Sequence, residues 1–270
     1  MNNYTLITGS SSGIGYELAI KFAEEGQNDQ TIMQNELSKH HKVTMHKLQK
    51  LKERINEKTS VDVIIFPCDL TNEDSLNRLF KHFDESNENI DILCNNAGVG
   101  YYGDFLDSKI ENAVSMIALN ITALTRLTYY FGNKMKMRNT GTILNIASVG
   151  SFVPGPMFAV YYATKAYVLS FSEALSMELK PYNVNVCTIC PGPTNTNFFI
   201  NASTGQIDLL KRIKPVSPRV VSEFAYNSLK KKKVVGIPCF KNKISVFFTK
   251  HLSRKTVRKI MYKIQNNRTK

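Results

Sequence analysis

Short apolar runs alternate along this chain with longer amphipathic stretches, and this alternation limits the possible folds more than any other feature of the sequence. The apolar runs are YTLIT (4–8), VDVIIFP (61–67), IDILCNN (90–96), GTILNIAS (141–148) and VNVCTI (184–189). The stretches with helical spacing cover residues 14–25, 47–57, 73–83, 109–138 and 161–179. Apolar strands separated by helices predict βαβ units, in which helices cover both faces of a parallel sheet.

Length and composition predict a single soluble domain. The 270 residues are 43% hydrophobic, enough to bury a large core, and no linker or internal repeat divides them. The chain has no apolar run of about 18 residues, and its N-terminus lacks the basic and hydrophobic regions of a signal peptide. Four of the five cysteines lie in or beside apolar runs, a usage that fits a reducing cytoplasm. We expect a cytoplasmic protein without a cleaved signal.

A glycine-rich turn follows the first apolar run and opens a helix. It reads Thr8-Gly9-Ser10-Ser11-Ser12-Gly13-Ile14-Gly15. Glycines permit a tight turn and a close approach of the main chain to a pyrophosphate, which the amides of the helix N-terminus then bind. An ordinary strand-to-helix loop explains such a turn about as well, so its position after the first strand is what gives it weight.

Tyr161 and Lys165 are four residues apart in a stretch with helical spacing, so they share one face of the helix. A phenol titrates near 10 in water, and a neighbouring ammonium favours its ionised form. The pair can therefore act as a tuned proton donor and acceptor. Tyr162 has no such partner and is interpreted as a packing residue. Taken alone, the pair could equally be a surface tyrosine and lysine.

These elements occur with others in a fixed order. The full set is Thr8 to Gly15, Asn95-Asn96-Ala97-Gly98, Asn120, Ser148, Tyr161-x-x-x-Lys165 and Pro191-Gly192. The order and separations closely resemble those of the short-chain dehydrogenase/reductase family, over residues 4 to about 200. The resemblance implies a single-domain, Rossmann-type α/β fold with a doubly wound parallel sheet. It also implies an NAD(P)-dependent oxidoreductase that transfers a hydride between the nicotinamide and a carbonyl or alcohol.

The resemblance implies a role for each of four catalytic residues. Tyr161 protonates the carbonyl oxygen or deprotonates the alcohol, and Lys165 lowers the pKa of Tyr161 and binds the nicotinamide ribose. Ser148 holds the substrate oxygen, while Asn120 anchors a water molecule in a proton relay. Cofactor contacts are implied for a larger set: Gly9, Ser11, Gly13, Ile14, Gly15, Asp69, Asn95, Ala97, Gly98, Tyr161, Lys165, Pro191, Gly192, Thr194 and Thr196. No metal ligand is expected.

The second strand departs from the family pattern. Between Gly26 and Lys47 the sequence is mostly polar, with weak strand candidates only in QTIMQ (30–34) and KVTMH (42–46). Neither the Asp that selects NAD nor the Arg that selects NADP stands at the expected place. The neighbourhood is basic through Lys39, His40, His41, Lys42 and Lys47, so NADP is favoured over NAD.

The two ends of the chain differ sharply in charge. Residues 201–270 contain 18 Lys+Arg and 2 Asp+Glu, whereas residues 1–200 contain 17 and 20. Apolar residues at 244, 247, 248, 252, 257, 260, 261 and 264 predict an amphipathic helical region with a basic outer face. It resembles the tail of a bacterial branch of the family. We assign residues 1–200 to the cofactor-binding and catalytic core, and residues 201–270 to a substrate lid and this extension of the same domain. The extension packs on the body or a second subunit, or else contacts an anionic membrane surface.

Apolar residues also crowd the segments expected to surround the substrate, which predicts a small hydrophobic carbonyl or alcohol compound as the partner. They are Phe152, Val153, Pro154, Met157, Phe158, Phe198, Phe199 and Ile200. We expect a homodimer or homotetramer. Two other functions remain open: a nucleotide-binding regulator of the same fold without turnover, and a nucleic-acid-binding protein. The second lacks a recognition motif and interleaved stacking aromatics.

Overall fold

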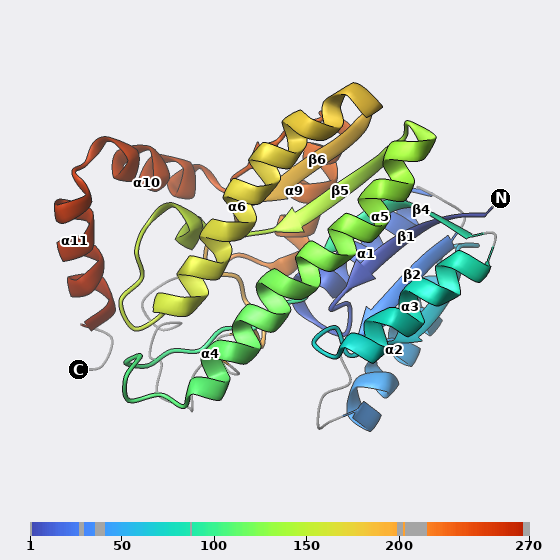
Figure 1. The fold of residues 1–270 in the computed structure, drawn as a ribbon, viewed down its shortest axis with the longest axis horizontal. Coiled ribbons are helices and arrows are strands. Elements are labelled where there is room, and N and C mark those ends of the chain that lie inside the picture. The colour runs from blue at the N-terminus through green and yellow to red at the C-terminus, as the bar shows by residue number, and fades with distance from the viewer. Residues whose placement is uncertain are drawn as a thin grey trace.

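A computed structural model describes residues 2–26, 30–35, 41–86, 88–198, 202 and 215–266 (Figure 1). The strands are β1 (Asn2–Thr8), β2 (Gln30–Asn35), β3 (Asp62–Pro67), β4 (Glu88–Asn95), β5 (Gly141–Ile146), β6 (Val184–Ile189) and β7 (Val235–Gly236). The main helices are α1 (Gly13–Glu24), α2 (His41–Asn56), α3 (Glu73–Glu85), α4 (Ile110–Ile117), α5 (Leu124–Arg138), α6 (Ala159–Leu179), α9 (Pro218–Lys230), α10 (Phe240–His251) and α11 (Arg254–Asn266). Shorter helical segments are η1 (Ala118–Ala123), η2 (Val149–Phe152) and η3 (Lys180–Tyr182).

All seven strands belong to one parallel sheet of order β3-β2-β1-β4-β5-β6-β7. The chain adds strands outward from β1 on one side, then crosses to β4 and adds strands on the other. The carboxyl ends of β1 and β4 therefore flank the point where the strand order reverses. Ligands of open α/β sheets bind outside the carboxyl ends of the strands at such a point.

Helices cover both faces of the sheet, as the sequence predicted. Leu6 and Ile7 are both fully buried, although consecutive residues of β1 face opposite sides of the sheet. Ile7 belongs to a hydrophobic cluster with residues of α1, α2 and α9. Leu6 belongs to a second cluster, which contains residues of α3, α5 and the end of α6. The α/β doubly wound architecture is thereby confirmed.

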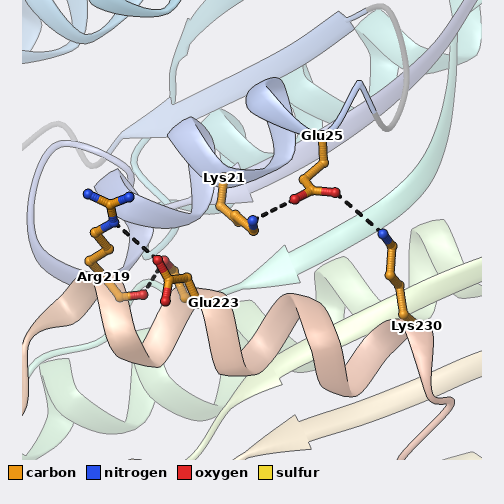
Figure 2. Close-up of polar contacts among 6 residues, drawn as sticks. Lys21, Glu25, Arg219, Glu223 and Lys230 are labelled. Carbon is orange, nitrogen blue, oxygen red and sulfur yellow. Dashed lines mark hydrogen bonds and ion pairs between the residues drawn. The ribbon is translucent and has the colours of Figure 1, made fainter.

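Helix α9 packs along α1 and closes one of these layers. The Phe22 and Tyr226 rings meet edge to face with centroids 5.6 Å apart. At the ends of the two helices, Glu25 pairs with Lys21 at 2.6 Å and with Lys230 at 3.3 Å (Figure 2). Exposed ion pairs of this kind stabilise little, so ring packing contributes more to this contact than charge does.

Two regions differ from the sequence-based expectation. QTIMQ does form a strand, since β2 pairs in parallel register with both β1 and β3. KVTMH does not, because residues 42–46 lie in α2. The C-terminal extension consists of two helices, α10 and α11, rather than one continuous apolar stripe. Within the described ranges, no helix has the length and apolar character needed to cross a membrane.

Candidate active site

The glycine turn between β1 and α1 lies at the carboxyl end of β1. Gly9 has φ of +66° and Gly13 has φ of +61°, a left-handed conformation that glycine adopts without strain. A Cβ on Gly9 would lie 2.9 Å from the Cα of Ala97, and a Cβ on Gly15 would collide with the Gly9 carbonyl and Asn96. The turn thus brings bare main chain to the N-terminus of α1, which is the arrangement that binds phosphate groups.

Thr8 and Asn96 fasten this turn to the end of β4. The Thr8 Oγ1 accepts hydrogen bonds from the Asn96 and Ala97 amides, both at 3.0 Å. In return, Asn96 Nδ2 donates to the carbonyls of Thr8 at 2.9 Å and Gly9 at 3.2 Å. Sequence reasoning assigned neither residue a contact of its own, although both stand inside motifs that it recognised.

Asn95 was expected to line the cofactor, but its side chain turns into the protein. Its Nδ2 donates to Thr128 Oγ1 at 3.0 Å and to Asn145 Oδ1 at 2.9 Å. Asn145 continues the chain of polar contacts to Ser172 at 2.8 Å. Because the Asn95 side chain is buried in this network, any contact with a ligand falls to its main chain.

Asn120 lies in η1, a π-helical segment between α4 and α5. Its side chain is buried and pairs with the main chain of Val99, accepting from the amide at 3.0 Å and donating to the carbonyl at 2.9 Å. It also donates to Thr164 Oγ1 at 3.0 Å. Such π-helical turns occur frequently at functional sites. Here the turn directs an amide towards α6, beside the helical face that carries Tyr161 and Lys165.

Ser148, Tyr161 and Lys165 converge at the carboxyl end of β5. Ser148 caps η2, where its Oγ accepts from the Gly150 amide at 3.0 Å, and its side chain acts to lower the pKa of the nearby Tyr161 hydroxyl. Lys165 Nζ donates to the Ile146 carbonyl at 2.8 Å and lies 5.9 Å from the centroid of the Tyr161 ring. The four predicted catalytic residues therefore gather within one region, since Asn120 reaches the same helix through Thr164.

Burial governs the protonation of this pair. Desolvation raises the pKa of Tyr161 above its usual range, against the opposing effect of the Ser148 hydrogen bond. Desolvation also lowers the pKa of Lys165 to about 8. Lys165 is not among the groups that shift the pKa of Tyr161, for which desolvation is the largest cause. The lowering of this pKa by Lys165 stays a prediction. At neutral pH the Tyr161 phenol is protonated.

The segment after β6 closes the other side of the glycine turn. A Cβ on Gly13 would lie 2.9 Å from the Thr196 methyl group, so the Pro191–Thr196 segment reaches α1. Thr194 holds the segment in shape by donating to the Gly192 carbonyl at 3.0 Å. Asp69 lies after β3, where its Oδ1 accepts from the amide and hydroxyl of Thr71 at 2.9 and 2.7 Å.

The residues present fit a dinucleotide. The glycine turn leads directly into the N-terminus of α1, at the carboxyl end of β1 where the strand order reverses. At Gly98, a Cβ would lie 3.1 Å from Asn120 Oδ1 and 3.4 Å from Lys165 Nζ, so the main chain after β4 passes close to both side chains.

Comparison with known proteins agrees with this geometry. The short chain dehydrogenase family model matches residues 3–206. The chain belongs to the short-chain dehydrogenase family. It is 32% identical to human 17-beta-hydroxysteroid dehydrogenase type 3 over 202 residues, which is 73% of this chain and 60% of that protein. A short-chain dehydrogenase from Sphingobium yanoikuyae, solved in complex with NADPH, superimposes with a TM-score of 0.78 and 30% identity, covering 89% of each chain.

This short-chain dehydrogenase spans only part of several curated relatives. It is 28% identical to the probable oxidoreductase EphD of Mycobacterium tuberculosis over 246 residues, which is 85% of this chain but 40% of EphD. The match therefore establishes the family of the domain. It does not carry over the activity of the longer proteins.

Aromatic side chains surround Tyr161 in this short-chain dehydrogenase. Its ring centroid lies 5.0 Å from that of Phe198 and 6.1 Å from that of Phe158. Tyr162 packs against Gly150 and Gly155, in agreement with its interpretation as a packing residue. Its hydroxyl also accepts from Gln265 Nε2 at 3.1 Å, a contact from the far end of the chain that the sequence did not predict.

Some of the expected residues lie outside the described part of the chain. Phe199, Ile200 and the basic positions 39–40 are not among the described residues, and nothing is described of the side chains at 41–43. Cys187 and Cys190 are buried free thiols whose pKa values desolvation raises to about 12. Thiols that stay protonated are poor nucleophiles and metal ligands, so both cysteines are packing residues.

Proposed function

We propose that this protein is an NAD(P)(H)-dependent oxidoreductase that interconverts a carbonyl and an alcohol on a hydrophobic small molecule. The observation that carries the proposal is the convergence of Tyr161, Ser148 and Lys165 at the carboxyl end of β5, with Asn120 joined through Thr164. The glycine turn at the N-terminus of α1, at the carboxyl edge of the same sheet, supports a bound dinucleotide.

Tyr161 is the proton donor in the direction of reduction. Its raised pKa keeps the phenol protonated at neutral pH, which is the form that can protonate a carbonyl oxygen as negative charge develops. Ser148, whose side chain acts to lower the pKa of Tyr161, holds the same oxygen in place. When bound, the nicotinamide supplies or accepts the hydride.

Lys165 and Asn120 return a proton from solvent to Tyr161 after Tyr161 has protonated the substrate. Lys165 has a pKa of about 8, so it is close to the pH at which an ammonium exchanges protons readily. Asn120 is fixed by its contacts with Val99 and Thr164, and it anchors a water molecule that links Lys165 to solvent. Lys165 also binds the nicotinamide ribose.

The substrate is a compact hydrophobic ketone or secondary alcohol. Phe158 and Phe198 flank Tyr161, and Phe152 follows Ser148 in η2, so a molecule that approaches Tyr161 meets mostly apolar surface. The likeness to a 17-beta-hydroxysteroid dehydrogenase supports a substrate of this character. NADP and NAD differ at the adenosine ribose, at the end of the cofactor away from the nicotinamide. The basic sequence around Lys47 favours the phosphate of NADP there.

A turnover assay tests this function. Purified protein, NADPH or NADH, and a panel of ketones that ranges from small polar to bulky apolar would be followed by loss of nicotinamide absorbance. We expect turnover that is fastest with apolar ketones, and a lower dissociation constant for NADPH than for NADH. Binding of NADPH without turnover on any ketone or alcohol would identify a nucleotide-binding regulator instead. The oligomeric state and a cytoplasmic location stay predictions.

A further inference from the structure

Helix α10 contacts the body of the protein through its polar side. Val246 is the buried residue of α10. Asn242 packs against the main chain of Gly192, so closely that a Cβ added to Gly192 would lie 2.6 Å from Asn242 Nδ2. Lys250 extends over the ring of Phe152 in η2, 5.2 Å from the centroid. These three positions are four residues apart and so share one face of the helix.

The opposite face of α10 is apolar and exposed. Successive residues of an α-helix are rotated by about 100°, so 240, 244, 247 and 248 fall together on the side away from Val246. Phe240 is 75% exposed, Phe247 and Phe248 are each 59% exposed, and Ile244 is 41% exposed. We call Phe240, Ile244, Phe247 and Phe248 the outer stripe. The predicted apolar positions 244, 247 and 248 therefore face away from the body.

The exposure of the outer stripe indicates that it binds an apolar partner. A helix at a protein surface normally buries its apolar side against the core, and clustered exposed aromatic residues mark an interaction site. Figure 1 shows α10 and α11 as an arm beside α6, away from the layers that cover the sheet. Nothing in the described part of the chain covers the outer stripe.

The charge around the outer stripe has one sign. No Asp or Glu follows Glu223, whereas 14 Lys+Arg do. In α11, Lys255, Arg258, Lys259 and Lys263 are exposed, and their spacing places them on the side of the helix opposite buried Val257. The arm thus combines an exposed apolar stripe with a dense positive charge and no compensating anion.

We propose that the outer stripe and these basic side chains dock on an anionic lipid bilayer. Lipid headgroups neutralise the lysines and arginines, while the aromatic side chains reach the boundary of the acyl chains. A second copy of this chain would bring two strongly positive arms together, which the charge opposes. A nucleic acid would satisfy the cations, but it would leave Ile244 and much of the aromatic surface in water.

Vesicle sedimentation tests the proposal. Purified full-length protein would be mixed with vesicles of phosphatidylcholine alone or with about one third phosphatidylglycerol, at low and high salt. We expect sedimentation with the anionic vesicles only, and weakening of the binding as salt screens the charges. Phe247→Gln/Phe248→Gln should weaken binding roughly tenfold or more, since two inserted aromatic groups are lost.

The matched control replaces equally exposed apolar residues elsewhere. Met137 and Met177 are 75% and 67% exposed and lie in α5 and α6 rather than in the arm, so Met137→Gln/Met177→Gln should bind like the wild type. Circular dichroism and NADPH binding would show that both double variants fold. The proposal is overturned if the wild type ignores anionic vesicles, or if Phe247→Gln/Phe248→Gln leaves their binding unchanged. It is equally overturned if that variant dissociates an oligomer, or if the arm binds oligonucleotides in preference to vesicles.

Discussion

Lys165 is a cation placed where a cation is costly. The residue is 6% exposed, and its ammonium donates to the carbonyl of Ile146 at 2.8 Å. Water would solvate the charged form far better, which is why the pKa of Lys165 falls to about 8. Burial of a lysine side chain lowers the stability of the fold, and such costs are typical of functional sites.

Replacement of Lys165 by Met should change how stability depends on pH. Between pH 8 and pH 10.5 the unfolded wild type keeps a proton on Lys165 that the folded protein has released. The free energy of unfolding of the wild type should therefore rise with pH relative to Lys165→Met, by up to about 3 kcal/mol. Urea unfolding of both proteins at pH 7.5 and at pH 10.5 measures this difference. A difference that does not change with pH would show that Lys165 is not buried as described.

Single residues of the site could be located from the sequence only where a motif fixed them. Asn120, Ser148, Tyr161 and Lys165 gather as the motifs predicted. The motif alone did not show which of two asparagines faces the glycine turn: the Asn95 side chain turns into the protein, whereas the Asn96 side chain binds the turn. The cofactor contact of Asn95 stays a prediction. The partners of Asn120 and of the glycine turn are close only in the folded chain, so spacing could not reveal them.

At the level of elements, helices with a clear apolar period were predicted to within a few residues, except that α2 begins at His41 rather than near residue 47. Strand β2 was only one of two weak candidates. Strand β2 lies between β1 and β3 and pairs with both, so the ladder of main-chain hydrogen bonds defines it. Its sequence QTIMQN lacks the continuous apolar run that marks the other central strands. Residues 42–46 include β-branched side chains, which favour a strand. They nevertheless form part of α2, because the helical spacing of apolar residues continues through the rest of that amphipathic helix.

The C-terminal extension shows a second limit of pattern reading. Apolar spacing correctly predicted helices, but it could not show that the helical region is interrupted at Ser253. There the Ser253 hydroxyl accepts a hydrogen bond from the Thr256 amide at 3.2 Å and caps the start of α11. Nor could it show which face meets the body. In α11 the contact includes Gln265, which is fully buried and accepts a hydrogen bond from Tyr102 at 3.3 Å through its carbonyl.

Removal of α11 should destabilise the protein moderately. Truncation after Leu252 removes buried Val257 and the hydrogen bonds that join Gln265 to Tyr162 and Tyr102. A buried valine and two hydrogen bonds are together worth about 3 kcal/mol, so we expect the melting temperature to fall by about 5 °C or more. Truncation after Asn266 keeps these contacts and serves as the control. Equal melting of the two truncated proteins would mean that α11 does not dock on the body.

At the scale of the whole molecule, the fold brings distant segments to the carboxyl edge of one sheet. The glycine turn, the end of β4, η1, η2 and α6 are spread over more than 150 residues, yet they meet around Tyr161 and Lys165. The parallel order of the strands accounts for this, because every strand of the sheet ends on the same edge. The class of fold could be predicted for the same reason, since alternating strands and helices leave few other arrangements.

The most direct test of the central claim is the turnover of Tyr161→Phe, measured beside Tyr162→Phe with NADPH and an apolar ketone. Phenylalanine keeps the ring between Phe158 and Phe198 but removes the hydroxyl that transfers the proton. We expect kcat to fall by about a hundredfold or more with little change in the dissociation constant for NADPH. Tyr162→Phe removes the hydroxyl that accepts from Gln265, not the proton-transferring one, and should stay within a few-fold of the wild type. Turnover of Tyr161→Phe within tenfold of the wild type would contradict the account.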